Sequence, residues 1–242
     1  MNTNILISVA DVILSLIFTV VVWRQYFERK RMHQLMWGIA IALWTIGVAA
    51  ELLTTIQGNW SEMTYRTYYV TGALLIPAWL GMGTLFLVLP QVWANRTLVG
   101  LSILSAIGIV LVLAGPAEMS RLQGVSVADV PKGIYPLIPT QLILIILNTL
   151  GAAAFILGAL WSAYHFMRMK AMGERALATA EIAVGGLVVA VAHSLGALGE
   201  IQLFRVSELA AILLIFAGFI LSNSPGASPV QSTSEPAPGM AK

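Results

Sequence analysis

The stretch GLVVAVAHSLGALGE, Gly186 to Glu200, places a histidine and a carboxylate inside a run that is otherwise apolar enough to cross a bilayer. On helical spacing, one face of this run carries its small residues together with its two ionisable residues, namely Gly186, Ala190, His193, Ala197 and Glu200. Small residues allow two helices to approach closely. We therefore expect this face to point into protein and not into lipid.

The composition of the whole chain is that of a membrane protein. Of its 242 residues 58% are hydrophobic and 10% are charged, whereas soluble domains are about one quarter charged. The net charge of +2 comes from basic residues that cluster between apolar runs, which indicates membrane orientation and not nucleic-acid binding. The chain has no cysteine, so its own side chains support neither disulfides nor thiolate or iron–sulfur chemistry.

Seven segments have the length and apolar character of membrane-spanning helices. They lie near Ile5–Trp23, Leu35–Thr55, Tyr69–Leu89, Leu98–Ala114, Thr140–Ala163, Ala176–Leu198 and Val206–Leu221. We therefore predict an all-α fold, a bundle of seven transmembrane helices that forms one domain over residues 1–222.

The charges that flank these segments predict their orientation. Residues 1–4 carry no side-chain cation, whereas basic residues follow the first segment, which is the reverse of a cleavable signal peptide. An outside N-terminus puts most loop cations in the cytoplasm, as the positive-inside rule requires: Arg24, Arg29, Lys30, Arg31, Arg96, Arg168, Lys170 and Arg175. We expect a multi-pass protein of the plasma (inner) membrane with a cytoplasmic C-terminus.

Two regions between or after the segments differ in composition. Gly115 to Ile138 forms a long outer loop rich in proline and glycine, for which a lid and a plain connector are equally good interpretations. Residues 223–242 are rich in Pro, Ser, Gly and Ala and have no apolar periodicity. We predict that they form a disordered cytoplasmic tail, because they bury too little apolar surface to fold.

Ionisable residues within the spans predict a polar site. Asp11 lies roughly 10 Å inside the first span, where a carboxylate costs about 2.5–3.5 kcal/mol and usually faces a partner or water. His193 lies at a similar distance from the outer end of the sixth span. We predict a polar cavity in the outer half of the bundle, lined by Asp11, Glu51, His193 and Glu200.

The same polar residues also have purely structural explanations. Asp11 and His193 would form a satisfied pair that only fixes helix register, and Glu200 would pair with Arg205. Ser207 and Glu208 have the pattern of a cap and a first-turn acid at the start of the seventh span. In the fifth span, Asn148 is expected to hydrogen-bond across helices without any role in activity.

Seven helices with an outside N-terminus resemble rhodopsins and other seven-helix receptors in span count. A Schiff base with retinal needs a lysine inside the bundle, but Lys30, Lys132, Lys170 and Lys242 all lie outside the predicted spans. The resemblance therefore transfers no residue, and we predict no covalent cofactor. Noncovalent binding of a pigment, a quinone or a lipid stays an alternative.

The sequence contains no motif for metal binding, haem ligation or catalysis. The four candidate residues come from separate helices without the tight spacing of a metal site, so no metal site is predicted. His33 and His165 lie near cytoplasmic helix ends, where solvent contact is more typical than haem ligation. The chain has no phosphate-binding loop and we predict no catalytic residues, so an enzyme is the weakest of the functional hypotheses.

Two functional hypotheses follow from the sequence. The first is a membrane protein whose outer polar cavity binds a small ligand or relays protons for transport or sensing. The second is a non-catalytic accessory or assembly subunit of a larger membrane complex, in which the buried polar groups only fix helix register, either without a ligand or with a noncovalent lipid, quinone or pigment. The partners expected are the lipid bilayer, a small molecule or other membrane subunits, and no nucleic acid.

Overall fold

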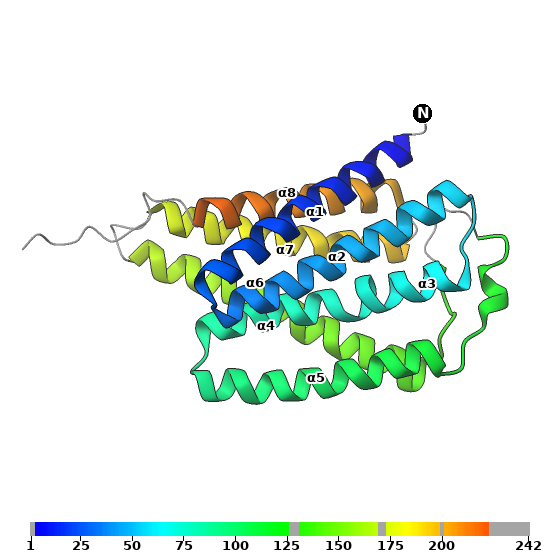
Figure 1. Ribbon diagram of the computed structural model, residues 1–242, viewed down its shortest axis with the longest axis horizontal. Helices are drawn as coiled ribbons and strands as arrows, with labels where there is room; N and C mark the ends of the chain where they lie inside the picture. The colour runs from blue at the N-terminus through cyan, green and yellow to red at the C-terminus, as the bar shows by residue number, and fades with distance from the viewer. Residues whose placement is uncertain (1–2, 126–130, 169–172, 199–200, 223–242) are drawn as a thin grey trace, which may run out of the picture.

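A computed structural model describes residues 3–125, 131–168, 173–198 and 201–222, with side chains for 5–125, 131–168, 176–191 and 206–222. Every regular element in these ranges is a helix (Figure 1). The elements are α1 (Thr3–Arg29), α2 (Met32–Gln57), α3 (Glu62–Tyr68), the π-helix η1 (Tyr69–Leu75), α4 (Ile76–Val88), α5 (Gln91–Ala114), the short helices η2 (Met119–Leu122) and η3 (Leu137–Gln141), α6 (Leu142–Arg168), α7 (Gly173–Leu198) and α8 (Ile201–Ser222).

The all-α membrane character predicted from the sequence is confirmed. Each predicted segment falls within a helix or a run of consecutive helices, except that Tyr69–Leu89 extends one residue past the end of α4. Among the described residues, five helices are long and apolar enough to cross a membrane: Ile5–Arg29, Met32–Gln57, Glu62–Val88, Gln91–Ala114 and Leu137–Arg168. Ala176–Val191 and Val206–Ser222 are shorter apolar stretches, so the count of seven spans and the orientation stay predictions.

Six of the long helices form a closed ring. In the order α1, α2, α4, α6, α7 and α8, each helix packs against the next, and α8 packs against α1. Helix α5 lies outside this ring, beside α4 and α6, and appears as the lowest helix in Figure 1. The first and last helices of the described chain, α1 and α8, therefore close the ring.

The two ends of the bundle differ in charge and in loop length. At one end, here called the basic end, α1 turns into α2 and Arg29, Lys30 and Arg31 lie together in sequence (left in Figure 1). The opposite end, here called the loop end, holds the start of α1 and the connection between α5 and α6 (right in Figure 1). These ends correspond to the predicted cytoplasmic and outer sides.

The described part of the long loop folds back onto the loop end. The Tyr135 hydroxyl donates to the carbonyl of Val112 at 3.2 Å, and the Glu118 N–H donates to the carbonyl of Ile134 at 2.8 Å. The Tyr135 ring also lies 4.6 Å from that of Tyr69, between ring centroids. Burial raises the pKa of Tyr135, which keeps its hydroxyl a neutral donor.

Glycines bring α4 and α6 into backbone contact. A Cβ built on Gly151 would lie 2.5 Å from the Cα of Ala78, and a Cβ on Gly81 would collide with the carbonyl oxygen of Gly151. Such small residues are what allow helices to approach closely in a membrane. This contact fixes one wall of the ring.

A π-helix and a proline distort the third span close to this contact. Pro77 has no N–H to donate within the helix, and η1 lies directly before it in the chain. A π-helix inserts extra backbone into a helix, and such insertions recur at functional sites. The distortion displaces the backbone of Gly72 and its neighbours relative to a straight helix.

We expect Gly151→Leu to lower the free energy of unfolding by about 1–3 kcal/mol, because the new side chain would meet backbone atoms of α4 that cannot rotate away. The measurement is thermal unfolding of the purified protein in mild detergent. Gly100→Leu is the matched control, since a Cβ on Gly100 has no heavy atom within 4 Å. Equal unfolding temperatures for the two variants would contradict this account of the α4–α6 contact.

Candidate functional site

A chamber of about 340 Å³ lies inside the ring between α4, α6, α7 and α8. It is lined by Ile76, Pro77, Leu80, Asn148, Thr149, Ala152, Phe155, Ile156, Gly186, Val189, Ala190 and Ile215. A smaller cavity of about 30 Å³ adjoins it towards α2 and shares Ile76, Pro77 and Val189 with it. Small-molecule sites are usually concave, mostly apolar spaces of about 300–1,000 Å³ with a few polar groups. The chamber has this size and character.

Asn148 is the polar residue of α6 that the chamber leaves unsatisfied. Its Oδ1 atom is shielded from solvent and has no hydrogen-bond partner among the described residues. The sequence-based expectation of a hydrogen bond across helices is therefore wrong for this atom. A buried acceptor without a donor costs about 1–3 kcal/mol, so a bound molecule that supplies a donor would recover this free energy.

Glu208 is the carboxylate closest to the chamber among the described lining residues. It lines the adjoining small cavity together with Trp44 and Tyr68. The expectation that Ser207 and Glu208 begin a helix is wrong, because α8 starts at Ile201 and Glu208 lies inside it. If α8 spans the membrane as predicted, a carboxylate in its interior points to a functional role more strongly than a cap does.

Asp11 lies on a buried polar stripe of α1. Asp11 and Ser8 are each 5% exposed and Ser15 is 0% exposed, although α1 otherwise presents many apolar side chains to its surroundings. The Ser15 hydroxyl donates to the carbonyl of Val12 at 3.1 Å. Asp11 therefore faces protein and not lipid.

Glu51 lies on α2 at the same level as Asp11. The hydroxyls of Thr19 and Thr45 are 3.0 Å apart, which fixes the register of these antiparallel helices. Asp11 and Glu51 each lie about two turns from that contact in the direction of the loop end. Glu51 is also buried, at 8% exposed.

Counting helical turns from a contact between α1 and α8 places Glu208 at the same height along the bundle as Asp11. The rings of Phe18 and Phe216 lie 4.8 Å apart between centroids, and Asp11 and Glu208 each precede them by about two turns. Three neighbouring helices, α2, α1 and α8, thus carry one carboxylate each at one height. No group of three histidine, aspartate or glutamate side chains suitable for a metal ion occurs among the described residues.

The other two predicted site residues lie at the edge of what the structure describes. The backbone of His193 belongs to α7, beyond Val189 and Ala190, which line the chamber. The His193 side chain and the whole of Glu200 lie outside the described residues. Their predicted part in the site therefore stays a prediction.

An aromatic layer closes the chamber on the side of the basic end. Phe18, Trp37, Phe155 and Phe219 surround a space of only about 10 Å³, and the rings of Phe18 and Phe219 lie 5.4 Å apart. A space of this size holds one water molecule at most. In the part of the chain that the structure describes, no open passage joins the chamber to the basic end through this layer.

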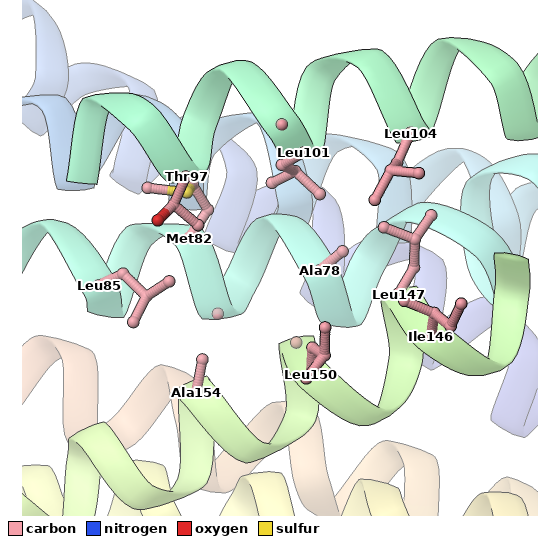
Figure 2. Close-up of a pocket in the computed structure, with 13 residues that line it drawn as sticks. Ala78, Met82, Leu85, Thr97, Leu101, Leu104, Ile146, Leu147, Leu150 and Ala154 are labelled. Carbon is pink, nitrogen blue, oxygen red and sulfur yellow. The ribbon is translucent and has the colours of Figure 1, made fainter. Parts of the chain in front are cut away.

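A second apolar space is a groove of about 260 Å³ outside the ring, between α4, α5 and α6 (Figure 2). Figure 2 shows Leu101 and Leu104 of α5 facing the apolar side chains of α4 and α6. The Thr97 hydroxyl donates to the carbonyl of Trp93 at 3.0 Å, and the other lining residues are apolar or glycine. The groove offers only dispersion contacts, whereas the chamber offers an unsatisfied acceptor, so the chamber is the candidate site.

Comparisons with known proteins find no match: no family model, no curated protein and no solved structure resembles this chain.

Sequence reasoning identified Asp11 and Glu51 but missed the chamber. Pro77 borders both the chamber and the adjoining cavity, but a proline in a span is also compatible with a plain kink. Oδ1 of Asn148 is unsatisfied because α4, α7 and α8 place no described hydrogen-bond donor near it. The sequence pattern within one helix carries no information about the donors on its neighbours.

We expect Asn148→Leu to raise the stability of the ligand-free protein by about 1–3 kcal/mol, because it removes a buried acceptor that lacks a donor. Thermal unfolding in detergent measures the change. Ser102→Leu, on the exposed side of α5, controls for the general effect of adding a leucine to a span. A loss of stability in Asn148→Leu would show instead that the protein itself satisfies this amide.

Proposed function

We propose that this chain is a seven-helix membrane protein that binds a small ligand in the chamber, for transport or sensing. The observation that carries the proposal is a partly open space of about 340 Å³ between helices of the ring, bordered by the unsatisfied acceptor of Asn148. An accessory subunit that used its polar residues only for helix register would gain nothing from such a space. A ligand-binding protein requires it.

Three carboxylates, of which Asp11 and Glu51 are buried and Glu208 is half-buried, supply a means of coupling ligand occupancy to protons. Asp11, Glu51 and Glu208 lie at one height on neighbouring helices, and carboxylates placed near one another or near a histidine exchange protons readily when their surroundings change. We include His193 and Glu200 in this site as predicted from the sequence. A ligand in the chamber that shifted α8 would alter the surroundings of Glu208 and, because α8 packs against α1, those of Asp11 as well.

The aromatic layer favours a gated protein over an open channel. Phe18 and Phe219 pack against each other between the chamber and the basic end. A ligand would cross towards the basic end only if these rings moved apart, and a sensor would need only a small shift of α8 relative to α1. The π-helix η1 and Pro77 provide a flexible point in the wall of the chamber.

The predicted orientation has a direct test because the chain lacks cysteine, so every introduced cysteine is a unique label. In intact cells, we expect a membrane-impermeant maleimide to label Asn59→Cys and Ser120→Cys, near the loop end, and to leave Asn95→Cys, near the basic end, unlabelled until lysis. Cell-surface labelling detected on a gel measures this. Labelling of Asn95→Cys alone in intact cells would reverse the orientation.

We expect Asp11→Asn and His193→Ala to flatten the pH dependence of ligand retention between about pH 5 and about pH 8, because each removes an ionisable group of the proposed site. The natively purified protein is washed across this range, and the retained molecules are extracted and measured by mass spectrometry. Gly100→Leu is the control with both groups intact. Wild-type pH dependence in both variants, with normal folding, would exclude these residues from the site.

A further inference from the structure

We infer that the ligand of the chamber is a neutral molecule with an apolar body and one hydroxyl group, an alcohol or a phenol, whose O–H donates to Oδ1 of Asn148. This inference rests on the proposed function and narrows its ligand class. Its starting point is the orphan acceptor of Asn148 inside an otherwise apolar chamber.

The lining of the chamber excludes a charged ligand group at this position. Apart from Asn148 and Thr149, every residue that lines it is apolar or glycine, and none of them is ionisable. A charge placed there would lose its hydration without gaining a counter-charge. The carboxylate of Glu208 borders the adjoining cavity of about 30 Å³ and not the chamber itself.

Asn148 determines which polar group suits the chamber. Oδ1 of a carboxamide accepts hydrogen bonds and cannot donate one, so the matching ligand group must carry an O–H or an N–H. A hydroxyl attached to an apolar body satisfies Asn148 and fills the remaining apolar space as well.

The volume sets the size of the apolar body. An engineered apolar cavity of about 150 Å³ is large enough to bind benzene. The chamber, at about 340 Å³, therefore accommodates a body larger than a single aromatic ring. A medium-length alkyl alcohol or a substituted phenol has the required size.

The position of the chamber provides a route from the bilayer. Thr149 lines the chamber and is exposed at the surface of α6, and Leu150, the next residue along, is 65% exposed. The chamber thus reaches the outer surface of the ring at α6, in a part of that helix that is apolar enough to lie within the membrane. An amphipathic neutral molecule that partitions into lipid reaches it without crossing water.

The experiment compares 1-octanol with octyl methyl ether, in which a methyl group replaces the hydroxyl hydrogen and so removes the donor. Binding to the purified full-length protein in detergent is measured as the concentration dependence of the thermal unfolding temperature. We expect the alcohol to bind roughly three- to tenfold more tightly than the ether, which corresponds to one net hydrogen bond. Asn148→Leu should abolish this preference, and Ala152→Phe, which fills the chamber, should abolish binding of both probes.

Equal affinities of the two probes for the wild type, with both lost in Ala152→Phe, would overturn the inferred ligand class and leave the proposed function intact. If neither probe binds, or both bind Ala152→Phe as they bind the wild type, the chamber is not a ligand site and both proposals fail. A preference for the alcohol that persists in Asn148→Leu would overturn the role of this amide. Asn148→Ala replaces Asn148→Leu if the leucine variant does not fold, and Ser102→Leu controls for effects outside the chamber.

Discussion

The structure depends on the absence of water in the hydrocarbon core of the bilayer, which forces each polar group of a span to find a partner within the protein. Several side chains solve this locally. The hydroxyls of Thr45 and Thr54 donate to the carbonyls of Ile41 and Ala50, one turn back on the same helix. An asparagine acceptor has no such local solution, since an Oδ1 atom cannot donate to a carbonyl. Asn148 is therefore one of several points at which the described residues leave the constraint unmet, and the chamber lies next to it.

The tight α4–α6 contact and the chamber next to it have a common cause. At Gly151 the backbones of α4 and α6 touch, which leaves no room for any side chain between them. Close to that contact, Pro77 and the π-helix before it shift the third span away from an ideal helical path, and the walls of both cavities include Pro77. Because α6 is held at Gly151, it cannot follow this shift. A gap at the level of Asn148 and Phe155 is the consequence.

The helices could be predicted because a membrane span is recognisable from its length and apolar composition alone. The matching height of Asp11 and Glu51 was also within reach of the sequence, since only Lys30 and Arg31 separate α1 from α2 and a short turn makes two helices antiparallel neighbours. Glu208 was misjudged because a serine before a glutamate resembles a cap, whereas α8 already begins at Ile201. Which helices close the ring, and which polar atoms that closure leaves unsatisfied, depends on contacts between distant segments. Periodicity within one segment carries no information about them.

The arrangement of the site along the bundle axis favours binding coupled to a small conformational change. Glu208 lies at the height of Asp11 and Glu51, on the side of the loop end, and the rings of Phe18 and Phe219 close the other side. Helix α8 contributes to all three parts, with Glu208 at the small cavity, Ile215 at the chamber and Phe219 in the aromatic layer. A ligand that displaces Ile215 would therefore move a carboxylate and an aromatic seal together. Since α8 also packs against α1, the same movement would change the surroundings of Asp11. In the proposed function, one helix would thus link occupancy of the chamber to both the protonation of the site and the closure of the bundle.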